Sequence, residues 1–263
     1  MIVNKEGIGK MNDKFTEGLV SIIMPVFNAS RYVIESVESI IAQTYNNWEL
    51  IIVDDCSIDD TLEKIDKYIK RDNRIRVIKL NENLGVAKAR NIAIEEANGR
   101  YIAFLDSDDK WKYNKLEKQL AFMNKNSYGL SFTAYEYIDS NSDKGKVVEV
   151  PNYQDYKMGL KNTIIGCLTV IVDRQITGEF YMPVISHGED HFTWLALMKR
   201  GFNAYGLNEC LAEYRITQTS LSSNKFKSIK MQWKNYRRIA KLPIYKCVYY
   251  FGCYILNAIL KRV

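Results

Sequence analysis

GRYIAFLDSDD, residues 99–109, decides the fold of this chain. An apolar run over 101–105 leads directly into three carboxylates, Asp106, Asp108 and Asp109. Short apolar runs bounded by turn residues are typical of buried strands, so the acids are expected where a strand leaves the sheet. Neighbouring carboxylates repel one another unless a cation shares them, and their oxygens suit Mg²⁺ or Mn²⁺. The stretch therefore predicts a metal site that holds substrate phosphates at the end of a strand.

A structural alternative stays open for the same acids. Ser and Asp are frequent residues at helix N-caps. The segment that follows Asp109 is predicted to be helical, so Ser107–Asp109 also fits a simple capping role.

Strands and helices alternate from residue 19 to residue 105. The first strand is expected to finish at Pro25, because proline cannot continue sheet pairing. The expected order is strand 19–25, helix 32–44, strand 49–53, helix 61–70, strand 75–80, helix 86–97 and strand 101–105. This alternation indicates an α/β fold with a mostly parallel sheet and helices on both faces. Ligands of such sheets bind beyond the carboxyl ends of the strands, so the polar residues that follow the four strands are expected to converge there.

Two common phosphate-binding motifs are missing after the first strand. Residues 19–31 contain neither the GxGxxG of dinucleotide-binding folds nor the GxxxxGK[ST] of P-loop proteins. Without a glycine-rich cradle, we expect a metal ion to neutralise most of the phosphate charge.

The composition is that of a globular protein with a basic C-terminal end. The chain has 263 residues, 47% of them hydrophobic, and a formal net charge of +6. Its five cysteines form no CxxC pair, which favours reduced thiols in a cytosolic protein. Residues 1–18 lack the apolar core of a signal peptide and are expected to be a flexible leader. No nucleic-acid recognition motif accompanies the basic residues, so nucleic acid is not an expected partner.

Several segments, taken together, resemble one enzyme family. In chain order they are SIIMPVFN, SIIAQTYNNWELIIVDDCSIDDT, NLGVAKARN, GRYIAFLDSDD, HGEDHFTWLALMKRG and YRITQTSLSSNK. The chain thus resembles the family 2 inverting glycosyltransferases of GT-A fold, and among them bacterial enzymes that build teichuronic acid, O-antigen or capsule polysaccharides. The resemblance implies a Rossmann-like nucleotide-sugar-binding subdomain at 19–120, an acceptor-binding and catalytic-base subdomain at 121–225, and basic amphipathic helices at 226–263.

The resemblance also implies which residues bind the donor. Asp108 is the expected metal ligand, with Mg²⁺ or Mn²⁺ as the cofactor. Asp55 is expected to bind the uracil ring, because a carboxylate can accept the N–H of uracil, and this favours a UDP-sugar. The residues expected to contact the nucleotide are Pro25, Val26, Phe27, Asp55, Asn83, Arg90 and Asp106.

Alternatives and further expectations accompany this set. Phe27 also fits a core aromatic, and Arg90 fits the partner of an ion pair. By resemblance, Asp109 caps the following helix. Arg215 and Lys225, which flank a hydroxyl-rich loop, are expected to close over the diphosphate.

HGEDHFTW, residues 187–194, supplies the second half of the expected site. Sugar transfer with inversion needs a base that takes the proton of the acceptor hydroxyl. By resemblance this base is Asp190, and Glu189 is expected to contact the acceptor. Trp194 is expected to offer a flat face to a sugar ring of the acceptor, and a place in the core is the alternative. Burial beside Trp194 would raise the pKa of Asp190 and make it a better base. From the residues alone, the two acids fit equally well as stabilisers of the start of a helix at 190–200.

The C-terminal segment 243–263 is apolar and rich in tyrosine. Its uncharged core, 247–260, is shorter than the roughly 20 residues that a membrane-spanning helix needs. The flanking lysines favour a helix that lies at the surface of an anionic membrane, and a helix buried against the core is the alternative.

These inferences predict an inverting glycosyltransferase that is peripheral at the cytoplasmic face of the cell membrane. It would move a hexose or N-acetylhexosamine from a UDP-sugar to a saccharide linked to polyprenyl diphosphate, in surface polysaccharide biosynthesis. Two alternatives stay open. FLDSDD also resembles the start of aspartyl-phosphate phosphatases, with Asp106 as the nucleophile. A non-catalytic protein that binds nucleotide sugars would need the same donor residues.

Overall fold

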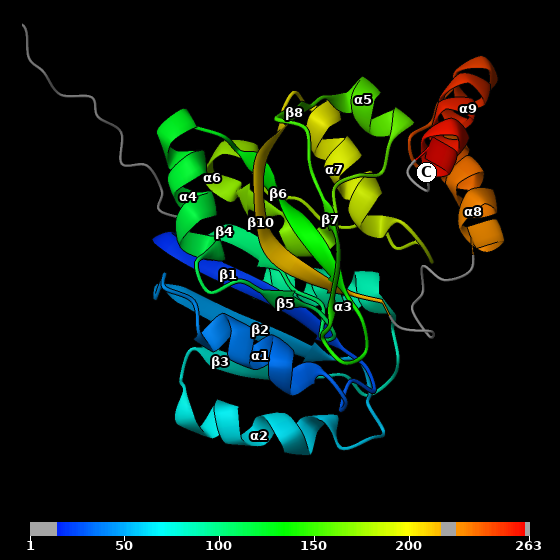
Figure 1. Ribbon diagram of the computed structural model, residues 1–263. Helices are drawn as coiled ribbons and strands as arrows, with labels where there is room; N and C mark the ends of the chain where they lie inside the picture. The colour runs from blue at the N-terminus through cyan, green and yellow to red at the C-terminus, as the bar shows by residue number, and fades with distance from the viewer. Residues whose placement is uncertain (1–14, 217–224, 261–263) are drawn as a thin grey trace, which may run out of the picture.

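One mixed sheet runs through the molecule. The computed structural model describes residues 15–216 and 225–260. Within these residues, ten strands join in the order β3-β2-β1-β4-β9-β6-β10-β5, with β7 on β6 and β8 on β10 (Figure 1). The strands are β1 (Thr16–Val26), β2 (Trp48–Asp54), β3 (Ile75–Lys79), β4 (Gly99–Phe104), β5 (Lys110–Trp111), β6 (Leu130–Ile138), β7 (Lys144–Val148), β8 (Tyr153–Gln154), β9 (Ile171–Asp173) and β10 (Ala204–Arg215). The helices are α1 (Val33–Ile41), α2 (Thr61–Arg71), α3 (Val86–Glu95), α4 (Lys115–Asn126), α5 (Tyr156–Lys161), α6 (Arg174–Thr177), α7 (Glu189–Lys199), α8 (Lys225–Arg238) and α9 (Ile244–Leu260), with a 3-10 helix, η1, at Cys167–Thr169.

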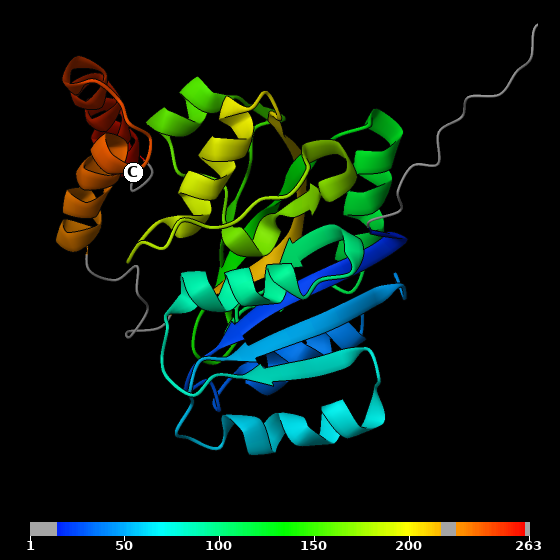
Figure 2. The ribbon, with the colours of Figure 1, turned by 180° about the vertical axis from the view of Figure 1, so that it is seen from behind.

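The first four strands form the predicted parallel sheet, in which β1 pairs with both β2 and β4 and β2 pairs with β3. On one face, α1 buries Val33, Val37 and Ile40. On the other face, α3 buries Ala89 and Ala93, and Figure 2 shows this helix lying across the sheet. The predicted α/β fold with helices on both faces is therefore confirmed.

The limits of β1 differ from the prediction at both ends. The strand begins at Thr16, so its first residues fall in the segment that we expected to be a flexible leader. It continues through Pro25 to Val26, and Pro25 lies opposite Val53 of β2. The pairing with β4 already ends at Ile23, opposite Phe104, so the missing N–H of Pro25 removes no hydrogen bond from the sheet.

The sheet continues beyond β4 with strands from the second half of the chain. β9 is antiparallel to β4 and to β6, and β6 is parallel to β10. The predicted nucleotide-binding and acceptor-binding subdomains thus share one sheet without a break. This arrangement places α7, from the second half, on the same face as α3, and the two helices contribute to one hydrophobic core.

The segment after Asp109 is not the predicted helix. Lys110 and Trp111 form β5, which pairs with β10, and the next helix, α4, begins at Lys115 with Asn114 at its N-cap. Asp109 is therefore not a cap, and the expectation of a capping role for it is wrong. Tertiary pairing with β10 has replaced local helix formation here.

The C-terminal helices α8 and α9 lie at the margin of the molecule (Figure 1). α9 contacts α5 and α8. Cys247 of α9 is fully buried, and Asn257 donates a hydrogen bond to the carbonyl oxygen of Lys161 at 3.0 Å. In the part of the chain that the structure describes, no helix combines the length and the apolar character needed to cross a bilayer.

Candidate active site

The end of β1 presents one aromatic side chain to solvent. Pro25 and Val26 are buried, and their expected contact with the nucleotide stays a prediction. The ring of Phe27 is 49% exposed, and it lies outside the hydrophobic core. The alternative of a core role for Phe27 is therefore wrong, and its expected contact with the nucleotide stays a prediction.

The end of β2 is joined to the loop that follows β3. The buried carboxylate of Asp55 accepts the N–H of Leu84 through Oδ1 at 2.6 Å and the N–H of Gly85 through Oδ2 at 2.9 Å. The side-chain amide of Asn83 donates to the carbonyl oxygen of Asp55 at 3.2 Å. Asp55 and Asn83 thus lie together, as a single nucleotide pocket requires. Both carboxylate oxygens of Asp55, however, accept hydrogen bonds from the loop after β3.

Three acids crowd the turn after β4. The Asp106 side chain keeps 30% of its surface exposed, whereas Asp109 is buried. Burial and the neighbouring Asp106 charge raise the pKa of Asp108 to about 6. Burial and the two other acids also raise the pKa of Asp109 well above its usual range. The turn therefore concentrates negative charge, and the nearby charges of Arg90 and Arg215 offset only part of the rise in the pKa of Asp108.

A buried arginine joins this turn to α7. Arg90, on α3 and 4% exposed, donates through Nη2 to Oδ1 of Asp106 at 2.6 Å and through Nη1 to Oε1 of Glu189 at 2.7 Å. The ion-pair alternative for Arg90 is thus correct. Arg90 and Glu189 are engaged with each other, and the expected contacts of Arg90 with the nucleotide and of Glu189 with the acceptor stay predictions.

Asp190 lies beside this bridge at the start of α7. Burial and the adjacent carboxylate of Glu189 raise its pKa to about 6, and the charge of Arg90 opposes the rise. Its Oδ1 accepts the N–H of His191 at 2.7 Å. Gly188 precedes the helix with φ +77, a conformation that few other residues adopt. The residue as a whole keeps an intermediate exposure at the start of the helix, although its carboxyl group is buried enough for desolvation to dominate its pKa.

Trp194 does not contact the acceptor. It is fully buried, and its ring lies edge-on to that of Phe104 at a centroid distance of 5.6 Å. The position is one turn after Asp190 on α7, on the side of the helix that faces the sheet. The expectation that Trp194 offers a flat face to a sugar is therefore wrong, because the core of the protein already covers that face.

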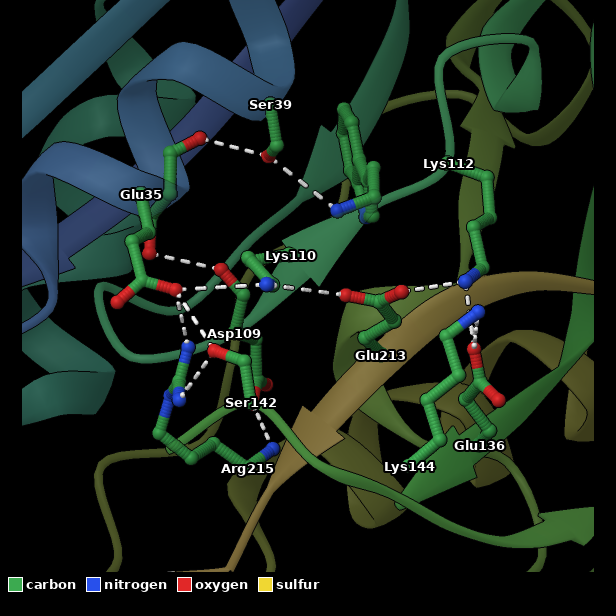
Figure 3. A network of polar contacts seen from close by, with 12 residues as sticks. Glu35, Ser39, Asp109, Lys110, Lys112, Glu136, Ser142, Lys144, Glu213 and Arg215 are labelled. Atoms are coloured by element: carbon green, nitrogen blue, oxygen red, sulfur yellow. Dashed lines mark hydrogen bonds and ion pairs between the residues drawn. The ribbon is translucent and has the colours of Figure 1, made fainter. Parts of the chain in front are cut away.

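Arg215 does not close over the diphosphate either. It is fully buried, and its donors are directed at protein acceptors around the turn of acids, as Figure 3 shows. The loop 217–224 and the side chain of Lys225 lie outside the described residues, so that part of the expectation is not tested.

Sequence reasoning missed Cys167, which is buried next to the bridge. Burial raises the pKa of its thiol well above the usual range, against the opposing effect of Arg90. The charges of Asp106, Asp190 and Glu189 add to the rise. The thiol is thus a neutral neighbour of the charged groups. A lone cysteine on a 3-10 helix leaves no pattern in the sequence that would have revealed it.

The turn of acids fits a divalent cation in part. Within residues 15–216 and 225–260, no group of three or more His, Cys, Asp or Glu side chains converges on a metal position. Asp106 and Asp108 nevertheless supply hard carboxylate oxygens in one turn. Mg²⁺ is commonly held by one or two carboxylates together with substrate phosphates. The residues present therefore suit a cation that binds with the substrate.

Comparisons with known proteins agree with this geometry. The family model described as Glycosyl transferase family 2 matches residues 21–173. TuaG of Bacillus subtilis (strain 168), a glycosyltransferase provisionally assigned to teichuronic acid biosynthesis, is 50% identical over 246 residues, which cover 93% of this chain and 98% of TuaG. WfgD of Escherichia coli, a UDP-Glc:α-D-GlcNAc-diphosphoundecaprenol β-1,3-glucosyltransferase, is 42% identical over 245 residues, which cover 93% of this chain and 95% of WfgD.

A solved structure shows the same fold. The crystal structure of TarS from S. aureus in complex with UDP-GlcNAc superposes with a TM-score of 0.67 at 19% identity, over 90% of this chain and 71% of that chain. The family match covers β2 and β4 and the acids that follow them, Asp55, Asp106 and Asp108. The chain therefore belongs to glycosyl transferase family 2, and it is a glycosyltransferase of GT-A fold.

Proposed function

We propose that this enzyme transfers a hexose or N-acetylhexosamine, with inversion at the anomeric carbon, from a UDP-sugar to a saccharide carried on polyprenyl diphosphate. The reaction belongs to surface polysaccharide biosynthesis at the cytoplasmic face of the cell membrane. WfgD, which uses UDP-Glc and a diphosphoundecaprenol-linked acceptor, supports this choice of substrates. TuaG supports the process, through its assignment to teichuronic acid biosynthesis.

The observation that carries the proposal is the Arg90 bridge. One guanidinium binds Asp106, in the turn where the donor diphosphate is expected, and Glu189, the residue next to Asp190. The expected base thus lies close to the expected leaving group. Inverting transfer needs this proximity, because the acceptor hydroxyl attacks the anomeric carbon on the side opposite to the departing UDP.

Asp190 acts as the base in this reaction. Its ionised carboxylate accepts the proton of the acceptor hydroxyl while the hydroxyl oxygen forms the new bond to the anomeric carbon. The bond from that carbon to the diphosphate oxygen breaks, and UDP leaves with the bonding electrons. A pKa of about 6 leaves the carboxylate mostly ionised in neutral solution and makes it more basic than an exposed aspartate.

The donor is held at the ends of β1, β2 and β4. Phe27 and the backbone of Pro25 and Val26 lie along the nucleotide, and Asp55 and Asn83 border the uracil. Asp108, with Asp106, would hold Mg²⁺ or Mn²⁺, whose chemistry there is to neutralise the charge of the leaving diphosphate. Residues 19–120 thus serve the donor, and residues 121–225 serve the acceptor.

A transfer assay tests the proposal. The purified chain is incubated with UDP-sugars, Mn²⁺ and GlcNAc linked to a lipid diphosphate, and the product linkage is determined by NMR. Asp190→Asn should lower kcat by about 10²- to 10⁴-fold, because the amide cannot take the proton. Asp66→Asn, on the exposed side of α2, is the matched control and should transfer like the wild type.

The same samples separate the alternatives. Full transfer by both Asp190→Asn and Asp108→Ala would show that the assigned mechanism is wrong. Release of phosphate from a phosphomonoester, lost in Asp106→Asn, would identify a phosphatase. Binding of UDP without any turnover of the donor would identify a non-catalytic protein.

Peripheral contact with the membrane through α9 completes the proposal. The exposed apolar residues of this helix gather on one face, and they are Ile244, Tyr245, Val248, Tyr249 and Leu256. The opposite face carries the buried Cys247, so the helix is held on the protein by one side only. The chain carries no Asp or Glu after Lys225, which suits an anionic lipid surface.

A further inference from the structure

Arg215 is a buried cation that binds the main chain of the turn formed by Asp106, Ser107, Asp108 and Asp109, here called the turn of acids. At the end of β10, it is 1% exposed. Its Nε donates to the carbonyl oxygen of Asp108 at 2.8 Å, and its main-chain N–H donates to Oδ1 of Asp109 at 2.8 Å. Ser36 of α1 adds a hydrogen bond to the carbonyl oxygen of Asp109 at 2.7 Å. The backbone of the turn is therefore fixed from two neighbouring elements.

The rest of the guanidinium reaches two other segments. Nη2 donates to Oε2 of Glu35 on α1 at 2.8 Å. Nη1 donates to Oγ of Ser142 at 3.0 Å, in the turn between β6 and β7 (Figure 3). It also donates to the carbonyl oxygen of Asp139, in the same turn, at 3.0 Å. The guanidinium also lies over the ring of Tyr32, 4.3 Å from its centroid. One side chain thus joins the ends of β4 and β10 to α1 and to the β6–β7 turn.

The charge of Arg215 is balanced within this cluster. Burial alone would raise the pKa of Glu35, but the hydrogen bond from Ser142 and the charges of Arg215 and Lys110 outweigh it and lower the pKa. Glu35 is therefore ionised next to Arg215. Lys110, which also contacts Glu35, forms an ion pair with Glu213 at 3.3 Å, so positive and negative side chains alternate through the cluster. Arg215 has its counter-charge in the protein and does not need a ligand to supply one.

We infer that Arg215 is a positioning residue for the donor site, which fixes the backbone of the Asp106–Asp109 turn so that Asp106 and Asp108 meet the diphosphate of the nucleotide sugar. The inference rests on the proposed function. Arg90 holds the side chain of Asp106, and Arg215 holds the main chain of Asp108. Neighbouring carboxylates repel one another, so a turn without these two anchors would spread its acids apart.

Arg174, the first residue of α6 (Arg174–Thr177), offers a matched control because its contacts lie at the other end of β4. It is also buried, at 4% exposed, and it donates to the carbonyl oxygens of Gly99 at 3.1 Å and Ala97 at 3.0 Å. These contacts lie at the amino end of β4, whereas Arg215 acts beyond its carboxyl end. Lysine keeps the charge but has no planar fork, so a lysine at either position loses the same kind of anchor.

The experiment compares Arg215→Lys, Arg174→Lys and the wild type. Thermal unfolding without ligand reports on the fold, and calorimetric titration of UDP with Mn²⁺ reports on the donor site. We expect both variants to lose a similar amount of thermal stability. Only Arg215→Lys should bind UDP about tenfold more weakly and need more Mn²⁺ for half-saturation. The reason is that only the loss of the Arg215 guanidinium lets Asp106 and Asp108 move. In the transfer assay, only the KM for the UDP-sugar should rise, and the KM for the acceptor should stay unchanged.

Glu35→Gln covers the case in which Arg215→Lys fails to fold. It keeps the shape of a side chain that is 40% exposed, removes the counter-charge of Arg215, and should weaken UDP binding in the same direction. If Arg215→Lys folds and binds UDP as tightly as the wild type, the inference is wrong. If Arg215→Lys does not fold, wild-type binding of UDP by Glu35→Gln would overturn the inference instead. A wild type that does not bind UDP with Mn²⁺ would instead refute the proposed function, and the inference with it.

Discussion

Asp190 lies between two charges that act on it in opposite directions. Burial and the carboxylate of Glu189 raise its pKa to about 6, and the guanidinium of Arg90 opposes them. A base must be ionised to accept a proton. We therefore expect kcat to fall as the pH drops through about 6, with about a tenfold loss for each further unit.

Replacing Glu189 should shift the acid side of the pH profile of kcat in a known direction. Glu189→Gln removes the charge that raises the pKa of Asp190, so the fall in kcat should shift to lower pH. Rates measured at saturating substrate across the acid range test this, with Glu95→Gln, an exposed acid at the end of α3, as the control. A loss of rate at every pH with an unmoved acid side would contradict the assignment.

Lys115 carries a charge that the fold does not neutralise. It is fully buried between the ring of Trp111, 4.4 Å away, and the amide oxygen of Gln119, at 2.7 Å. Burial lowers its pKa from 10.5 to about 7. A lysine with a lowered pKa in the folded state destabilises the protein once the pH falls below 10.5, and the cost grows until the pH reaches about 7.

Lys115→Met should therefore stabilise the protein in neutral solution, by on the order of 2 kcal/mol after the loss of one hydrogen bond to Gln119. The melting temperature should rise by a few degrees near neutral pH and by less in alkaline solution, where the wild-type lysine is neutral. Lys118→Met, at an exposed ion pair with Glu209, should change little. An equal gain at all pH values would show that packing, and not charge, is the cause.

At the residue scale, the type of a residue predicts its chemical role better than it predicts its burial and its contacts. The acids of the turn and the half-buried Asp190 follow from the motifs. The burial of Trp194 and the engagement of Arg215 do not, because both depend on which strands meet around them. Arg90 shows the same limit, since its two partners are 16 and 99 residues away along the chain.

At the scale of elements, β4 depends on its first residue. A Cβ atom at Gly99 would lie 2.5 Å from the carbonyl oxygen of Leu19 and 2.8 Å from the N of Ser21, both in β1. Only glycine lets β4 approach β1 so closely. The turn of acids at the other end of β4 depends on this approach, because it fixes where the strand ends.

Gly99→Ala should lower the stability of the protein by about 1–3 kcal/mol, since the backbone of β1 or β4 has to move. Gly252→Ala is the matched control: it is exposed on α9, nothing lies within 4 Å of its added Cβ, and alanine favours helices. Denaturant titration of both variants measures the difference. Equal midpoints would contradict the predicted clash.

The elements of the parallel half follow from their periodicity, and those of the second half do so less completely. Alternating apolar runs and helical stripes indicate β1 to β4 with the helices between them. β5 and β8 have 2 residues each and β9 has 3, too few for any period to be visible. β5 in particular formed where a helix was expected, because β10 offered it a partner.

At the scale of the whole molecule, α9 presents an exposed apolar face at one edge of the protein. The exposed Val248 and Leu256 belong to this face, at 59% and 62% exposed. The paired change Val248→Glu and Leu256→Glu should reduce binding to phosphatidylglycerol vesicles by about tenfold, because the apolar contact and the charge attraction are both weakened. Co-sedimentation of the full chain measures this binding.

Val147→Glu, at an exposed apolar residue of β7, is the control and should bind these vesicles like the wild type. Phosphatidylcholine vesicles should bind each of these proteins only weakly, because they lack the anionic headgroups. Unchanged sedimentation of the paired variant with phosphatidylglycerol would contradict the membrane role of α9.

The order of the strands in the whole sheet was beyond the reach of the sequence. Alternation along the chain predicts the parallel half, in which β1 pairs with β2 and β4 and β2 pairs with β3. β9, β6 and β10 pair across long separations, and no local pattern records such partners. The resemblance to the family implied the two subdomains, but only the structure shows that they share one sheet.

The bridge between Asp106, Arg90 and Glu189 sets a condition for hybrid enzymes. A chimera that joins residues 19–120 to the acceptor half of another transferase inherits a buried guanidinium. If the incoming helix brings a neutral residue to the position of Glu189, that cation loses one of its two carboxylates, at a cost of about 3–5 kcal/mol. Such a graft would be less stable than the parent enzyme by that amount, so the donor of the acceptor half must be chosen for its glutamate as well as for its substrate.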